Sequence, residues 1–510
     1  MNVINDPWLY VKYLDGSSRK ISVRQAFIDA EKIKDLDVPI FNKTKAYIYN
    51  VPVIQFLTTL IGATYFKPEY NFKSGKPNFN RWLMDNWDIS VFLNYFDQWI
   101  DRFELFDDNH PFLQEPKLKS TATVNPAYVS IFNPLAPSTN YSIFGNFRNA
   151  GEYSTSLDNY QFDETELVYI LLYLNAYGTT LAASTYRNKA ISYKATLFST
   201  LRGKNLKETL IYNCLDLTGS RPTKDEPDIE FDRPVWELNS LEDIKKYDFS
   251  TLSKNVLLCN FFPCYPVWVE FDGQIKNAVI SRTTNDCIFD EKTRDELSKS
   301  FIENHPYAIK RFSEDPKGNT DSGYTYREWV PDLKLINLCI DITKKLPKYT
   351  LCNVLDQDLS NVECVITYRE FLDKYKTRIV GCGEYIVAEG ILEKLKVTET
   401  HDKAETFQSI ITQIRRLIQR FGDQAQLDDM VANNCLLRFV QYSERYFFNE
   451  FIPNIEDETT LLTTTTDLSI FIDKLVKSLF DSVTNPVKFT EAYKWLNIGL
   501  SKLFKEELDG

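Results

Sequence analysis

Hydrophobic residues in the last quarter of the chain recur with the period of an α-helix. The first stripe consists of apolar residues spaced for one helix face: Phe407, Ile410, Ile411, Ile414, Leu417, Ile418 and Phe421. This spacing predicts an amphipathic helix, which Gly422 is expected to end. Further stripes predict helices over 428–451, 467–480 and 489–508. Four amphipathic helices joined by short polar links are typical of a four-helix bundle, so we expect residues 396–510 to form one.

Strand and turn signals mark the beginning of the chain. Residues 8–14 (WLYVKYL) are followed by a turn at Asp15 and Gly16 and by a second short strand-like run. This pattern predicts a β-hairpin. Ser22 and Gln25 then have the spacing of a capping box, which predicts that a helix begins there.

Helical and irregular patterns alternate in the next part of the chain. Residues 53–65 and 91–103 carry apolar residues with helical period and predict two helices. Segment 109–160 contains five prolines set among Asn, Ser and Thr, which predicts a long irregular stretch of the kind that is often functional. Asp163 and Glu166 then cap a nearly all-apolar run, which predicts a buried helix.

Residues 220–330 combine short strand-like runs with polar loops. Two of these runs, VWVEF and AVISR, flank Asp272 and Gly273 and predict a second hairpin. The whole pattern predicts an α+β protein with two domains. A large mixed domain is expected over residues 1–395, and the C-terminal four-helix bundle, residues 396–510, follows it.

Net charge, apolar runs and cysteine spacing exclude several classes of protein. The chain has 510 residues, 43% of them apolar, and a formal net charge of -12 with a pI near 5.1. Such an acidic balance argues against a free-standing nucleic-acid binder, whose surface is normally basic. No run approaches the ~20 apolar residues of a membrane span, and we expect a soluble, cytoplasmic protein. The nine cysteines contain no CxxC pair, so no zinc site or disulfide framework is predicted.

Candidate catalytic chemistry is scarce. The chain has only three histidines, His110, His305 and His401, and loop turns explain each of them. Nucleophile, metalloprotease, phosphate-loop and dinucleotide motifs are all missing. Acidic pairs such as Asp107 with Asp108 are explained equally by solvated loops. We therefore predict a binding or scaffold protein with no enzymatic activity, no cofactor and no metal.

Basic residues cluster in two places. Arg415, Arg416 and Arg420 share the face of the first bundle helix opposite its apolar stripe, a geometry that suits a phosphate backbone as well as ordinary solvated charge. The second cluster is the basic, hydroxyl-rich segment 186–207, which suits phosphate contacts.

Several motifs, taken in order, resemble one protein family. They are NVINDPWLYVKYLDG (2–16), FELFDDNHPFLQ (103–114), PSTNYSIFGNF (137–147), LRGKNLKETLIYNCL (201–215) and DRPVWE (232–237). Their shared order, with the terminal bundle, resembles the large subunit (CasA family) of the type I-E CRISPR Cascade complex.

The resemblance implies a function. Guide RNA reads the target by base pairing, while protein reads a short adjacent duplex motif, the PAM. The large subunit is expected to recognise the PAM, aid strand opening and help recruit the nuclease-helicase. Implied partners are the guide-RNA-containing Cascade subunits (backbone, small and guide-end subunits), target double-stranded DNA and the CRISPR nuclease-helicase, with no membrane. A minor-groove reader of this kind would tolerate related motifs.

The resemblance also implies site residues. The family's small-residue loop corresponds to Lys194, Ala195 and Thr196, beside Arg202, its hairpin lysine corresponds to Lys276, and its glutamine wedge corresponds to the region of Ala388. Here the hairpin tip carries Glu270 and Asp272, and Val387, Ala388 and Glu389 contain no glutamine. The arginines Arg415, Arg416 and Arg420 are expected to hold displaced or flanking DNA.

Three alternatives stay open at this point. The chain could be the large subunit of another type I subtype, with different partners and PAM. It could be a purely structural subunit without DNA contact, which the acidic pI favours. A metal-dependent hydrolase built on the acidic pairs is the third.

Overall fold

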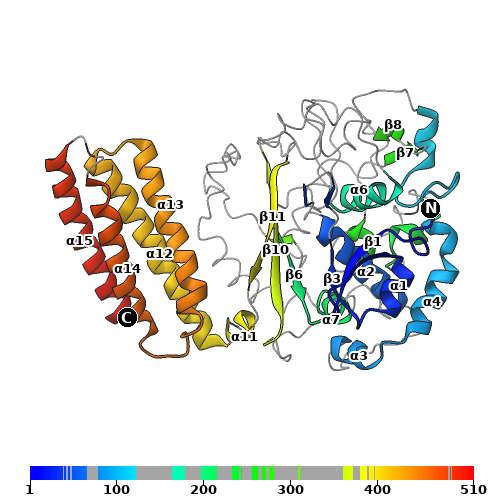
Figure 1. The fold of residues 1–510 in the computed structure, drawn as a ribbon, viewed down its shortest axis with the longest axis horizontal. Coiled ribbons are helices and arrows are strands. Elements are labelled where there is room, and N and C mark those ends of the chain that lie inside the picture. The colour runs from blue at the N-terminus through cyan, green and yellow to red at the C-terminus, as the bar shows by residue number, and fades with distance from the viewer. Residues whose placement is uncertain are drawn as a thin grey trace, which may run out of the picture. The chain divides into compact units, whose positions relative to one another are not determined.

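The computed structural model describes two compact units of the chain (Figure 1). The described residues are 1–37, 40–41, 44–45, 49–65, 79–121, 163–177, 197–214, 232–239, 243, 256–261, 267–271, 275–280, 308–309, 360–371, 379–387, 390–395, 397–480, 483 and 485–509. Those up to Val387 belong to the first unit, and those from Gly390 belong to the second. The prediction of domains 1–395 and 396–510 concerns folding units and stays a prediction.

The first unit begins with the expected hairpin. Strands β1 (Leu9–Tyr13) and β2 (Ser18–Ile21) pair antiparallel, and β3 (Ile33–Leu36) adds to the other side of β1. Helix α1 (Val23–Ile28) follows, with the Ser22 hydroxyl accepting from the Gln25 backbone N–H. The Gln25 side chain donates instead to Asp29, so only half of the predicted capping box forms.

Apolar helices form the core of this unit. Helix α2 (Asn50–Tyr65) is buried along nearly its whole length and packs against α6 (Glu164–Tyr177) and α4 (Ile89–Gln98). The Phe56 ring lies against five aromatic rings: Trp8, Phe103, Phe112, Trp236 and Phe261. Rigid rings of this kind bury large apolar areas, and the one polar atom of the Trp236 ring, Nε1, donates to Tyr95 OH.

Two predicted helix boundaries have different outcomes here. The box at Asp163 and Glu166 is confirmed in both directions, since each side chain accepts from the other residue's backbone N–H. The helix predicted over 91–103 is wrong at its end, because α4 stops at Gln98 and the 3-10 helix η2 (Ile100–Phe103) continues. The tighter winding still buries Phe103, so the apolar pattern continues across the change.

Later strands of the first unit form a second sheet and the second predicted hairpin. The sheet has the order β11-β10-β6-β9. Its strands are β6 (Leu197–Arg202), β9 (Ala308–Ile309), β10 (Glu363–Phe371) and β11 (Ile379–Val387). The hairpin is confirmed as β7 (Val267–Phe271) and β8 (Ile275–Ile280), with a register shift at Phe271.

The second unit is helical (Figure 1). After α11 (Ile391–Leu395) come α12 (Thr398–Ala425), α13 (Asp429–Tyr446), the π-helix η11 (Phe447–Phe451), α14 (Thr460–Lys477) and α15 (Pro486–Asp509). Helix α12 packs on α13 and α15, and α14 packs on the same two. The expected mixed fold with a helical C-terminal region is therefore observed. None of the helices in the described ranges is long and apolar enough to cross a membrane.

Among the helix ends that differ from those predicted, two have a structural explanation. Helix α12 continues past Gly422 to Ala425, and Gln426 ends it with a left-handed φ of 53°. Gly422 serves packing instead, since a Cβ there would lie 3.2 Å from Ala432 Cβ. Helix α14 begins at Thr460 rather than at 467, because hydroxyls such as that of Thr464 donate to carbonyls one turn earlier and are satisfied inside the helix.

Candidate nucleic-acid interface

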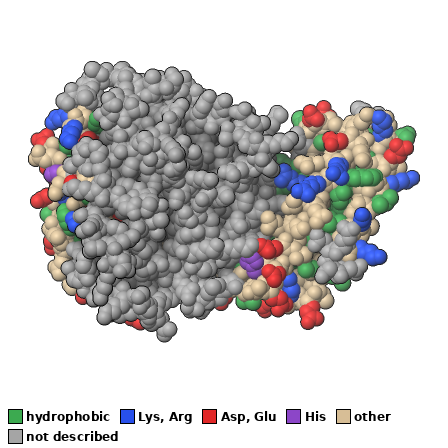
Figure 2. All heavy atoms as spheres, turned by 180° about the vertical axis from the view of Figure 1, so that it is seen from behind, with side chains coloured by type: hydrophobic (Ala, Val, Ile, Leu, Met, Phe, Trp, Pro, Cys, Tyr) green, Lys and Arg blue, Asp and Glu red, His purple; other side chains and the backbone are tan. Residues whose placement is uncertain are grey.

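The three arginines of α12 lie where the sequence predicts. Most of the apolar stripe of α12 is buried, whereas Arg416 and Arg420 are exposed and Arg415 is half-buried. Guanidinium groups keep their charge at every physiological pH. Figure 2 shows basic side chains across the middle of one face of the helical unit, with acidic side chains above and below them and a histidine near the lower end. The face can therefore present positive charge even though the whole chain is acidic.

Arg202 lies in a different environment. It ends β6, and its Nε is 2.7 Å from Asp35 Oδ2 of β3 while its Nη1 is 3.3 Å from Glu363 Oε2 of β10. The three side chains are only 18%, 20% and 29% exposed. Burial raises the pKa of Asp35, although the positive charge of Arg202 opposes this effect. Two carboxylates thus surround the guanidinium that the sequence assigns to DNA.

The turn after Arg202 is built around one glycine. Gly203 N–H donates to Thr209 Oγ1 at 3.0 Å, and a Cβ on Gly203 would collide with Glu208 Cβ. The Asn213 side chain bonds to both the N–H and the C=O of Leu201, as a neighbouring strand would. Helix α7 (Leu206–Tyr212) therefore clamps the end of β6. This explains the Leu-Arg-Gly motif as a rigid corner.

Strand register decides which candidate residues can approach one another. Leu201 pairs with Cys364, and Cys364 pairs with Val387. The end of β6 that carries Arg202 is therefore level with the end of β11, after which the chain runs to position 388. Leu197, at which β6 begins, lies at the opposite end of the strand.

The structure describes little of the other residues predicted for the site. Lys194, Ala195, Thr196 and Ala388 lie outside the described residues. Lys276 lies on β8, but its side chain is outside the description as well. The DNA-binding roles of these residues stay predictions.

A charged hollow lies beside the β6–α7 corner. Its volume is about 560 Å³, and it is lined by Leu14, Glu31, Met84, Lys204, Asn205, Lys207 and Glu208. Lys204 Nζ is 2.7 Å from Glu208 Oε1, and Lys207 Nζ is 2.8 Å from Glu31 Oε1. The two lysines at the end of basic segment 186–207 are thus paired with carboxylates, and the hollow has no excess of positive charge.

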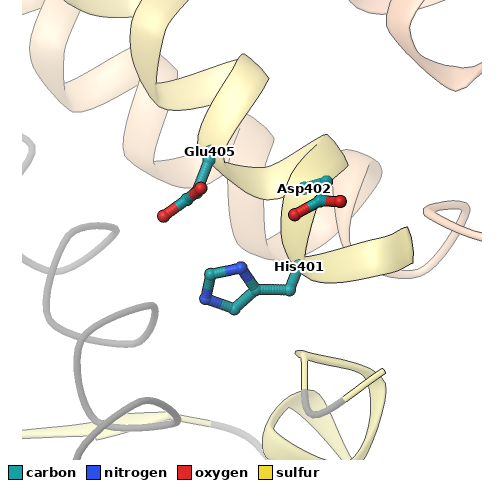
Figure 3. A group of neighbouring side chains, drawn as sticks. All are labelled: His401, Asp402 and Glu405. Atoms are coloured by element: carbon teal, nitrogen blue, oxygen red, sulfur yellow. The ribbon is translucent and has the colours of Figure 1, made fainter. Parts of the chain in front are cut away.

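One cluster has side chains of the type that bind metals. His401, Asp402 and Glu405 lie at the start of α12, and one potential ligand atom from each lies within 4.8 Å of the others. Figure 3 shows one imidazole nitrogen turned toward the carboxylates and the other turned away from them. Asp402 is exposed, and exposed acidic groups often gather without an ion. We assign no role to this cluster, and the expectation of no metal stays a prediction.

Sequence reasoning missed two residues of this interface. Asp35 and Glu363 hold Arg202, yet they are far from it and from each other in the sequence and belong to no motif. Isolated acidic residues of this kind carry no local signal. Only the pairing of β10 with β6, and the placement of β3 beside them, brings the three charges together.

Comparisons with known proteins agree with this architecture. The family model described as CRISPR-associated protein Cse1 (CRISPR_cse1) matches residues 2–322. No curated protein matches the chain. The structure of Thermus thermophilus CasA (Cse1) is similar over 99% of each chain, with a TM-score of 0.62 and 14% identity.

Two further structures show the same fold. Thermobifida fusca Cse1 covers 99% of this chain and 98% of its own, with a TM-score of 0.62 and 14% identity. A chain of a CRISPR RNA-guided surveillance complex covers 99% of both, with a TM-score of 0.59 and 13% identity. Because the family model matches more than half of the sequence, this chain belongs to the Cse1 family of CRISPR-associated proteins.

Proposed function

We propose that this chain is the non-catalytic large subunit of a type I-E CRISPR surveillance complex. In this role it recognises the PAM in duplex DNA, aids strand opening and helps recruit the nuclease-helicase. Membership of the Cse1 family carries the proposal, and similarity over 99% of the chain to a subunit of an RNA-guided surveillance complex supports it.

The charge distribution fits a subunit better than an independent DNA binder. The net charge of -12 repels a phosphate backbone, whereas exposed Arg416 and Arg420 provide a local basic face. Backbone, small and guide-end subunits carrying the guide RNA would supply most of the phosphate contacts. Local base-edge or groove contacts by this chain would then add specificity.

A binding comparison tests the proposal. The guide-loaded complex is prepared with and without this chain and mixed with target duplexes whose flanking bases are randomised. We expect flank-dependent binding only when the chain is present. Binding that ignores the flank in both preparations would make a purely structural subunit the better account. Co-purification with a small helical subunit distinguishes type I-E from another type I subtype.

A further inference from the structure

One face of α14 points away from the two helices on which α14 packs, α13 and α15. Both carboxylates of α14 turn toward those neighbours instead. Asp467 accepts from Tyr446 OH of α13 at 2.8 Å, and Asp473 accepts from Tyr493 OH of α15. The exposed residues of α14 up to Ile470 are therefore uncharged.

Five exposed residues on this outer face are spaced four apart. They are Glu458, Leu462, Thr466, Ile470 and Lys474. Leu462 and Ile470 are 54% and 49% exposed, which is high for large apolar residues. Residues four apart form a ridge along the surface of a helix. Glu458 precedes α14, but Thr459 has a φ of -86° and a ψ of -2°, in the right-handed helical region, so the ridge continues through it.

The order of charges along this ridge is complementary to itself when it is reversed. The ridge is acidic at one end, apolar and neutral in the middle and basic at the other end. A two-fold axis that passes Thr466 places Leu462 of one copy against Ile470 of the other. It also places Glu458 against Lys474 at both ends of the contact. Two-fold interfaces use the same surface on both copies, and ridges of this kind interdigitate at a crossing angle of about -50°.

The groups on the ridge can form this contact without losing bonds inside the chain. Thr466 Oγ1 donates to Leu462 O at 2.9 Å, so the central hydroxyl is already satisfied within the helix. Burial of Leu462 and Ile470 removes apolar surface from water. Within the part of the chain that the structure describes, the side chains of Glu458 and Lys474 form no hydrogen bond or ion pair.

We propose that the outer face of α14 binds a second copy of this chain, in an antiparallel contact around a two-fold axis at Thr466. The contact is weak, because one pair of helices buries less than the ~800 Å² per partner of a standard interface. The net charge of -12 on each copy also opposes association. The inference goes beyond the proposed function, since it concerns the free chain and requires neither DNA nor guide RNA.

Charge reversal at the two ends of the ridge tests this contact. Sedimentation velocity is measured on the full-length chain from about 1 µM to about 1 mM, a range that covers weak and moderate affinities. The samples are wild type, Glu458→Lys, Lys474→Glu and an equimolar mixture of these two variants. In the mixture, each variant meets opposite charge in its partner at both ends. Glu491→Lys and Lys494→Glu, at exposed positions of α15, are the matched controls for net charge.

We expect the wild type to dimerise reversibly as its concentration rises. Either reversal alone should weaken the dimer about tenfold or more, because both attractive pairs become repulsive. The mixture should recover the wild-type affinity within about threefold, and the controls should change it by no more than that.

A cysteine at the axis gives a second readout that changes no charge. Thr466→Cys should form a disulfide-linked dimer under mild oxidation, because the axis brings the two copies of this residue together and a disulfide needs closely spaced Cβ atoms. Asn497→Cys, at an exposed position of α15, should not form one. Non-reducing electrophoresis measures both variants.

Several results would overturn the inference. A wild-type chain that stays monomeric throughout the series does so, and it leaves the outer face of α14 to a different protein. A dimer that survives either reversal, or a mixture that does not recover, has the same meaning. Circular dichroism shows whether a reversal unfolds the helices, and the comparison of Thr466→Cys with Asn497→Cys then decides the question.

Discussion

Gly203 lies so close to Glu208 that no side chain fits between them. The contact is with Glu208 Cβ, which the backbone of α7 holds in place, so a neighbouring atom cannot simply rotate away. Glu208 also accepts from the Lys204 backbone N–H at 3.0 Å. The corner between β6 and α7 is therefore closed from both sides.

Replacement of Gly203 by alanine should destabilise the first unit by about 1–3 kcal/mol, the usual cost of overpacking. Chemical denaturation followed by circular dichroism measures this loss. Gly499→Ala is the matched control, because a Cβ there meets only the side chain of Leu417, at 3.0 Å. An equal effect of both substitutions would mean that the corner is less rigid than its contacts indicate.

The buried carboxyl group of Glu166 should make the free energy of unfolding depend on pH. Burial raises the pKa of its carboxyl from 4.5 to about 7, although the hydrogen bond from the Asp163 backbone N–H opposes this. The folded state thus holds the proton more tightly than the unfolded state. The stabilisation is full below pH 4.5 and is lost as the pH rises through 7.

Glu166→Gln should therefore stabilise the protein at pH 8 by about 1–3 kcal/mol and change little at pH 4.5. Thermal melts at the two pH values measure the difference. Glu164→Gln, an exposed neighbour in the same first turn, should show a much smaller effect. Destabilisation by Glu166→Gln at both values would show that a charge interaction of Glu166 outweighs its burial.

The basic face of α12 should contribute to the salt dependence of DNA binding. Reversing Arg415, Arg416 and Arg420 to glutamate should reduce the slope of log affinity against log salt by about two to three, since each phosphate contact contributes about 0.9. The assembled complex is titrated with target duplex at several salt concentrations. Arg445→Glu, an exposed arginine on α13, is the control. An unchanged slope would leave the three arginines as solvated charge.

Reversing the charge of Lys194 tests whether this residue contacts the PAM. Lys194→Glu should weaken binding of a PAM-bearing duplex by the assembled complex about tenfold or more, because it replaces attraction by repulsion at the phosphates. Lys12→Glu, at an exposed position of β1, should leave binding unchanged. Wild-type affinity in the Lys194 variant would remove this residue from the site.

Local patterns predicted much of the secondary structure. The hairpin at Asp15, the box at Asp163 and the apolar stripe from Phe407 all depend on residues within a few positions of one another. Two errors concerned the ends of helices in the second unit, one from a contact between helices and one from bonds within a helix. Gly422 lies against Ala432 and does not end its helix, and threonine hydroxyls after Thr460 bond to the helix backbone.

The candidate nucleic-acid interface was predictable only in part, because some of its contacts join residues that are distant along the chain. Arg416 and Arg420 share a face because of spacing alone, so the sequence was sufficient to place them together. Arg202 looked equally basic in the sequence. The structure pairs it with Asp35 and Glu363, and no residue near Arg202 in the chain indicates that pairing.

The amino-acid sequence was enough to establish the α+β class, the helical C-terminal region and the resemblance to the CasA family, because periodicity and motif order are properties of neighbouring residues. Tertiary contacts were needed to establish which charged side chains are paired with one another. The sequence shows which residues are charged, but the partners of Arg202 come from strands that are distant along the chain. The register of β6 and β10 brings Glu363 to Arg202, and β3 of the other sheet supplies Asp35.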